Sequence, residues 1–100
     1  MFGAMKMMRI TKQPEGLIEL LLDKKAEFGD RDDSAIDLGE FEDPTAEDAL
    51  TRIVQDMSED GDIPDRAGES LAEIWKRKSK WDSALVSRMH PESRKYFNWK

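Results

Sequence analysis

The chain has 100 residues, of which 22 are acidic and 16 are basic, so its net charge at pH 7 is −6. This length suits a single domain, and with 38% hydrophobic and 38% charged residues we expect a thin core under a polar surface. The absence of cysteine excludes a disulfide framework and a thiolate metal site, which favours a cytoplasmic protein. Lys6 and Arg9 interrupt the apolar start, and no small-residue cleavage site follows, so we expect neither a signal peptide nor a membrane span.

The charges are distributed unevenly along the chain. Residues 1–74 contain 20 acidic and 8 basic residues, a net charge of −12, whereas residues 75–100 contain 2 and 8, a net charge of +6. The acidic part would repel phosphate, and the basic end has no groove-reading motif, so the sequence argues against a nucleic-acid partner. A basic protein is the natural complement of such a surface.

Apolar residues recur with the period of a helix along most of the chain, and no stretch alternates as a strand would. The predicted fold class is therefore all-α. The first helix is expected to begin at Pro14 and to end near Lys25. A polar turn at Gly29 then leads to a short second helix over residues 32–41.

The third predicted helix has the clearest signals, because Asp43 can cap it and Pro44 suits its first position. The apolar residues that follow share one face: Ala46, Ala49, Leu50, Ile53, Val54 and Met57. Pro64 is predicted to open a fourth helix, Asp82 to cap a fifth and Pro91 to start a sixth. We therefore expect five to six helices.

The chain also aligns with itself at an offset of 33 residues. This offset superposes Leu17 on Leu50, Leu20 on Ile53, Leu21 on Val54, Asp32 on Asp65, Leu38 on Leu71, Glu40 on Glu73 and Phe41 on Ile74. The match runs through a helix, a loop and a second helix, which indicates an internal repeat of helix pairs.

Three segments resemble the bacterial HEAT-like repeats of the kind also found in bilin lyases. They are residues 32–41 (DDSAIDLGEF), 43–50 (DPTAEDAL) and 65–75 (DRAGESLAEIW), within a resemblance that covers about residues 14–90. It implies a short α-solenoid in which each repeat pairs an outer A helix with an inner B helix. The second and fourth helices would be A helices, and the first, third and fifth would be B helices.

The whole chain, residues 1–100, would then form one HEAT-like domain. Residues 1–12 would be a flexible or capping N-terminus, and residues 91–100 a C-terminal cap, because two to two and a half units are near the minimum for a continuous core. The chain departs from the family in having few repeats and a longer, more acidic loop between helices.

Residues 56–67 follow part of the EF-hand pattern, with aspartate at loop positions 1, 5 and 7 and glycine at position 6. The pattern lacks the bidentate carboxylate that calcium needs at loop position 12, because Ala67 stands there. Ser58 at position 3 and Pro64 at position 9 depart from it as well. We therefore expect a solvated acidic loop in place of a calcium site, and neither metal nor cofactor.

No pattern for catalysis stands out. Asp33 and Asp37 form a carboxylate pair at i and i+4, but in a chain this acidic such a pair is expected to face solvent or a partner. His90 is the single histidine and precedes a proline, which places it at a helix end. With one histidine and no cysteine, nucleophile–base and zinc patterns are excluded, so we expect no enzyme.

The acidic residues on the predicted second helix and on the following repeat are the candidate partner-binding site. They are Asp30, Asp32, Asp33, Asp37 and Glu40, with Asp60, Asp62, Asp65 and Glu69 from the next unit, and Trp81 as an apolar contact. A dense negative field of this kind speeds association with a basic protein. The leading hypothesis is an immunity or inhibitor protein that masks the active site of a basic, nuclease-type toxin, since HEAT-like repeats occur among such inhibitors. It would be a monomer when free, or a heterodimer with its partner.

The main alternative is a scaffold or chaperone-like subunit of a larger assembly. There the acidic residues would serve solubility, and the partner would contact four aromatic residues: Trp81, Tyr96, Phe97 and Trp99. Trp75, by contrast, is predicted to lie in the core because it falls on the inner face of the fourth helix. An enzyme of the bilin-lyase kind is a third possibility.

Overall fold

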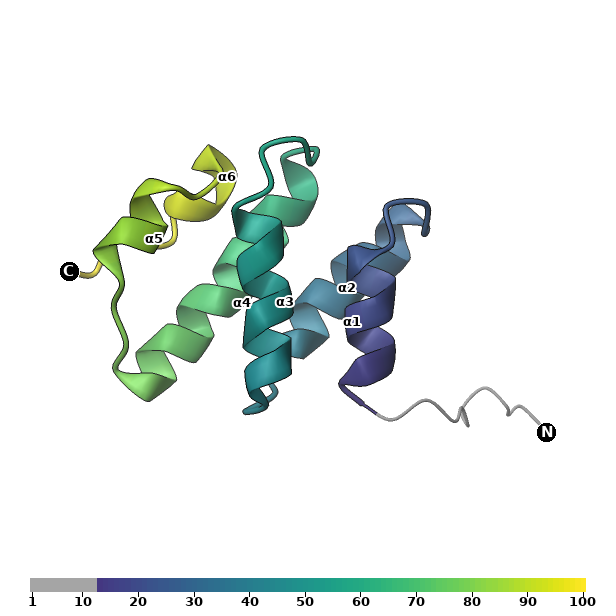
Figure 1. Ribbon diagram of the computed structural model, residues 1–100, viewed down its shortest axis with the longest axis horizontal. Helices are drawn as coiled ribbons and strands as arrows, with labels where there is room; N and C mark the ends of the chain where they lie inside the picture. Colours follow the sequence, from purple (N-terminus) through teal and green to yellow (C-terminus); the bar gives the residue numbers. More distant parts are fainter. Residues whose placement is uncertain (1–12) are drawn as a thin grey trace.

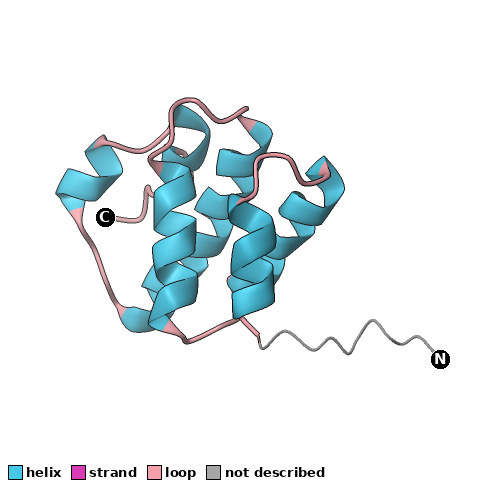
Figure 2. Cartoon of the chain, turned by 45° about the vertical axis from the view of Figure 1, so that its right-hand side comes forward, coloured by secondary structure: helices cyan, strands magenta, loops and turns pink. Residues whose placement is uncertain are grey.

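A computed structural model describes residues 13–100, and the predicted N-terminal segment 1–12 lies outside the described residues. The part described is all-α, as predicted, and contains no strand (Figures 1 and 2). Its six helices are α1 (Glu15–Leu22), α2 (Phe28–Leu38), α3 (Pro44–Val54), α4 (Asp62–Lys78), α5 (Ser83–Ser87) and α6 (Pro91–Arg94). In this part of the chain, no helix is both long and apolar enough to cross a membrane.

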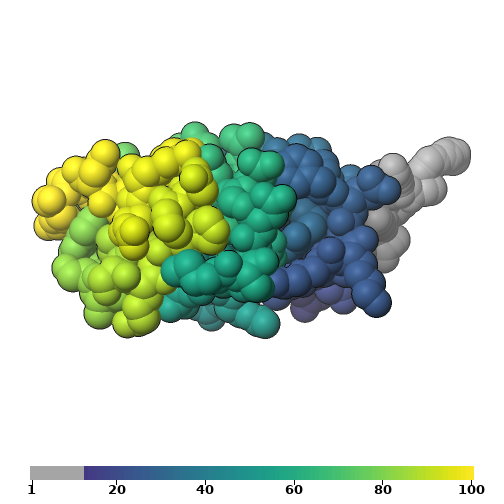
Figure 3. Space-filling model, turned by 90° about the horizontal axis from the view of Figure 1, so that it is seen from above, coloured from purple at the N-terminus to yellow at the C-terminus, as the bar shows by residue number. Residues whose placement is uncertain are grey.

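The four longer helices form two antiparallel pairs, α1 with α2 and α3 with α4 (Figure 1). α1 and α3 lie in one layer, with α2 and α4 side by side behind them. α5 and α6 cover the far side of the second pair, where α6 packs on α4. Seen from above, these units follow one another along the longest axis of the molecule (Figure 3). The fold is a short helical solenoid of antiparallel pairs.

The 33-residue offset found in the sequence relates the two helix pairs in space. It places α1 on α3 and α2 on α4. Leu21 and Val54, which the offset superposes, are both fully buried, and the same holds for Leu38 and Leu71. The repeat therefore reflects two units that bury equivalent positions in one continuous core.

Local capping explains where three of the helices begin. Asp43 Oδ1 accepts a hydrogen bond of 2.8 Å from the backbone N–H of Thr45, so α3 begins at Pro44 as predicted. Asp82 caps α5 in the same way through the N–H of Leu85. The imidazole Nδ1 of His90 accepts from the N–H of Glu92 and so caps α6, which gives the lone histidine a structural role.

The predicted boundaries of α2 are wrong at both ends. Gly29 does not form a turn but lies in the first turn of α2, which begins at Phe28. The helix starts early because Arg31, in its first turn, is buried and donates a hydrogen bond to the carbonyl oxygen of Leu21. It ends at Leu38, and Phe41 lies in the connection to α3.

Three further boundaries also differ from prediction. α1 ends at Leu22, before the predicted end near Lys25. α3 ends at Val54, so Met57 lies in the following loop and its side chain is 57% exposed instead of packing inward. α4 begins at Asp62, which makes Pro64 its third residue. Proline is tolerated there because the first N–H groups of a helix have no partner within it.

Candidate protein-binding surface

Four of the predicted partner-binding residues lie on one exposed side of α2 and its C-terminal extension. Asp30, Asp33, Asp37 and Glu40 are separated by three, four and three residues, which places them on one helix face. All four are exposed, and within residues 13–100 none takes part in an ion pair. We call these four residues the acidic stripe. Its charge is uncompensated by neighbouring side chains.

A shallow hollow of 290 Å³ lies beside the acidic stripe, between α2 and α4. Its lining residues are Ile36, Glu40, Arg66, Glu69, Ser70 and Glu73. Ile36 is 42% exposed, so its side chain gives the hollow an apolar part. Glu73, which the repeat superposes on Glu40, forms no ion pair among the described residues. The hollow thus offers an apolar surface flanked by carboxylates.

Asp32 is not part of the free acidic surface, contrary to prediction. Its carboxylate is partly buried and accepts a hydrogen bond of 3.0 Å from Arg66 Nε of α4. Arg66 also donates to Glu69 at 3.3 Å, so this predicted site residue is paired as well. The Asp32–Arg66 ion pair joins α2 to α4, whereas the Arg66–Glu69 pair lies within α4.

Asp65 is likewise used within the fold. It accepts hydrogen bonds from Lys95 Nζ at 2.8 Å and from the Tyr96 hydroxyl, which joins α4 to the residues after α6. Burial raises the pKa of Asp65, but these hydrogen bonds outweigh burial and lower the pKa below its usual range. The same hydrogen bond raises the pKa of Tyr96 to about 12. Asp32 and Asp65 are equivalent in the repeat, so each unit binds the next one through the same aspartate.

The loop that resembles an EF-hand is occupied by the protein's own cations. Asp56 accepts a hydrogen bond of 2.8 Å from Lys24 Nζ and others from Ser58, and together they lower the pKa of Asp56 to about 2. Asp60 and Asp62 are exposed and lie apart from these contacts. Nowhere in residues 13–100 do three acidic or histidine side chains converge as metal ligands would.

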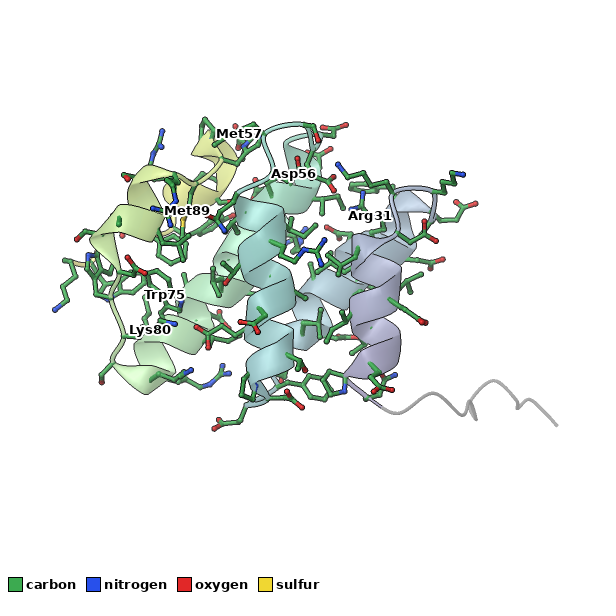
Figure 4. All side chains as sticks on the ribbon, in the orientation of Figure 1. Arg31, Asp56, Met57, Trp75, Lys80 and Met89 are labelled. Carbon is green, nitrogen blue, oxygen red and sulfur yellow. The ribbon has the colours of Figure 1, made fainter. Side chains whose placement is uncertain are left out.

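A buried ion pair between Arg31 and Glu59 was not predicted from the sequence. Arg31 donates to both carboxylate oxygens of Glu59, at 2.6 and 3.2 Å, and the two residues are only 7% and 8% exposed. Its Nε donates in addition to the carbonyl oxygen of Leu21 at the end of α1, at 3.0 Å. This arrangement joins α1, α2 and the loop before α4, and it fixes the first turn of α2, where Figure 4 labels Arg31.

Trp81, the predicted apolar contact for the partner, packs among other aromatic residues, and its role in binding stays a prediction. It belongs to an aromatic cluster of Trp75, Trp81, Phe97 and Trp99, in which its ring lies 6.0 Å from that of Trp75 and 5.0 Å from that of Trp99. Trp75 is fully buried, as predicted, and Phe97 is buried too. In Figure 4 Trp75 lies near the opposite end of the molecule from Arg31 of α2.

Acid should destabilise the fold between about pH 4 and about pH 2, because four carboxylates have lowered pKa values: Asp43, Glu47, Asp56 and Asp65. In Glu47, burial raises the pKa, but hydrogen bonds from Lys78 and Lys80 outweigh it. A carboxylate with a lower pKa in the folded state stabilises the fold above its unfolded pKa, and this contribution disappears as the pH falls through the folded value.

The midpoint of thermal unfolding, followed by circular dichroism, should therefore be constant from about pH 6 to about pH 5 and fall steeply below about pH 4. Asp56→Asn should show a smaller fall over the same range, since it lacks one of the titrating groups. A midpoint that is the same at about pH 5 and about pH 2 would contradict the assignment.

Comparisons with protein-family models, with curated proteins and with solved structures find no match to this chain. The HEAT-like resemblance and its functional implications therefore stay predictions. The site is defined by its own geometry, which places the acidic stripe and the exposed Ile36 on neighbouring parts of α2.

Proposed function

We propose that this protein is a non-catalytic binding module whose acidic stripe docks a basic surface of another protein. One observation carries this proposal, namely that four exposed carboxylates share one helix face without a basic partner in the described chain. Paired carboxylates such as Asp32 and Asp65 contribute little external field, because a cation lies beside each of them. The stripe therefore adds to the field outside the molecule without a neighbouring cation to cancel its charge.

The partner class that fits best is a basic, nuclease-type toxin, with this protein as its cytoplasmic immunity or inhibitor protein. A nuclease carries a cationic groove for the phosphates of its substrate, and a row of carboxylates on a rigid helix can occupy that groove in their place. α2 is suited to this role because the Arg31–Glu59 pair fixes its first turn to the rest of the fold.

A scaffold subunit is the second candidate, and Ile36 is the observation that favours it. An exposed isoleucine between glutamates offers an apolar contact that depends little on salt. The aromatic contact expected from the sequence is less available for this role, because Phe97 is buried and Trp81 packs within the aromatic cluster.

Cancelling the net charge of the stripe, from −4 to 0, should weaken partner binding at least about tenfold, which corresponds to about 1.4 kcal/mol. The variant is Asp33→Lys with Asp37→Lys, and the binding partner to test first is the product of the adjacent gene. Binding is measured by calorimetry at about 50 mM and about 300 mM salt, and the wild-type affinity should fall steeply with salt.

The matched control is Glu19→Lys with Asp48→Lys, which makes the same charge change on the exposed side of the α1–α3 layer. This control should bind nearly as well as the wild type. Equal weakening by both double variants would show that net charge matters and the stripe does not. An affinity that does not depend on salt would favour the apolar contact at Ile36.

A further inference from the structure

The basic C-terminal part of the chain forms a surface that the proposed function does not use. Lys76, Ser79, Lys80, Trp99 and Lys100 line an open hollow of 330 Å³ beside the C-terminal end of α4. Lys76 Nζ lies 4.8 Å from the centre of the Trp99 ring, which orders this side chain at the edge of the hollow. We call these five residues the basic cleft.

Part of the positive charge of the basic cleft is available to a ligand. Glu47 accepts hydrogen bonds from Lys78 and Lys80, at 2.6 and 2.7 Å, so one carboxylate is shared by two ammonium groups. Neither Lys76 nor Lys100 lies in an ion pair among the described residues. The cleft therefore keeps a local positive charge on a protein whose net charge is −6.

The basic cleft and the acidic stripe lie towards opposite ends of the molecule. α2 belongs to the first helix pair, whereas Lys80 and the aromatic cluster lie at the other end of the longest axis (Figures 1 and 4). The two surfaces thus cannot meet within one molecule. Between two molecules they can meet end to end, as the units of the solenoid follow one another within the chain.

We propose that the basic cleft binds the acidic stripe of a second copy of this protein. Charge complementarity favours this occupant, because the same molecule carries a row of free carboxylates whose charge is opposite in sign to that of the free ammonium groups. Nucleic acid is a poorer occupant, since the acidic residues outnumber the basic ones and repel a phosphate backbone. The contact is heterologous, so it leaves one stripe and one cleft free and extends into an open chain.

This contact would also regulate the proposed function, because self-association covers the stripe that a basic partner needs. Only this regulatory role rests on the proposed function; the self-association does not. The monomer expected from the sequence is then the state at high salt or low concentration. Because the contact can be measured on the purified protein alone, its failure and the failure of partner binding are distinguishable.

Sedimentation velocity tests the proposal on the full chain. At about 20 mM salt the average mass should rise above 11.5 kDa with increasing concentration, and at about 300 mM salt it should return to the monomer value. Two double variants, Lys76→Glu with Lys100→Glu and Asp33→Lys with Asp37→Lys, should each stay monomeric at low salt. An equimolar mixture of the two should associate again, because the unchanged stripe of the first variant can bind the unchanged cleft of the second.

Control variants with the same charge changes elsewhere should associate like the wild type. They are Lys25→Glu with Arg52→Glu and Glu19→Lys with Asp48→Lys, all at exposed positions without ion pairs in the described chain. A wild-type protein that stays monomeric at low salt and high concentration overturns the proposal. Association that both control variants abolish also overturns the proposal. A mixture of the cleft variant and the stripe variant that does not associate overturns it as well.

Discussion

Replacing Glu59 by methionine should lower the free energy of unfolding by about 3–5 kcal/mol, because it leaves the Arg31 guanidinium buried without its counter-charge. The remaining contact of Arg31, from Nε to the Leu21 carbonyl, satisfies one donor but neutralises no charge. Urea unfolding followed by the fluorescence of the buried Trp75 measures the loss. This is the largest effect that we expect from any single polar side chain.

The double variant Arg31→Met with Glu59→Met should recover most of that loss. It removes both charges, and an apolar pair of similar shape is often as stable as a buried ion pair. The control is Glu42→Met, which breaks the ion pair with Arg77, where the atoms lie 3.7 Å apart and Glu42 is highly exposed. Its effect should be below about 1 kcal/mol. A Glu59 variant as stable as the Glu42 variant would show that the buried pair is not needed.

The helices of this protein could be predicted wherever the signals are local. Asp43 and Pro44 define the start of α3 by capping chemistry, and the apolar spacing that follows defines its buried face. The 33-residue offset identified the pairing of helices as well. The start of α2 could not be predicted, because Gly29 favours a turn locally and only the burial of Arg31 overrides that preference.

The candidate site was predicted only in part, and the reason lies in pairing between distant residues. In the sequence, Asp32 and Asp65 cannot be told apart from the acidic residues of the stripe. Only the fold brings Arg66 beside Asp32 and Lys95 beside Asp65. A signal for this existed, because the repeat superposes Asp32 on Asp65 and a basic residue follows each of them by 34 and 30 residues. Ile36 was missed because its exposure depends on where α4 lies, which the local sequence does not give.

These pairings divide the acidic residues into two groups with different physical roles. Asp32, Glu59 and Asp65 hold successive units together, so their replacement should reduce stability before it affects binding. Asp33 and Asp37 face solvent and can be changed with little effect on the fold. The two groups allow binding and stability to be tested separately on one small protein.

Replacing Gly68 by alanine should lower the free energy of unfolding by about 1–3 kcal/mol, despite the higher helix propensity of alanine. A Cβ atom at this position of α4 would lie 2.6 Å from the Cα of Ser93, which is backbone and cannot rotate away. Relief requires α6 to move, and this movement breaks the hydrogen bond of 2.6 Å from Ser93 Oγ to the Pro64 carbonyl. The α4–α6 contact would therefore loosen.

Gly29 provides the matched control for this substitution. It is also within a helix, but it is exposed and a Cβ atom there meets nothing within 4 Å. Gly29→Ala should therefore raise the free energy of unfolding by about 0.5–1 kcal/mol, since alanine restricts the unfolded chain and favours the helix. Urea unfolding should give opposite signs for the two variants. If both stabilise the protein, α6 does not approach α4 as closely as described, and the second unit of the solenoid lacks its cap.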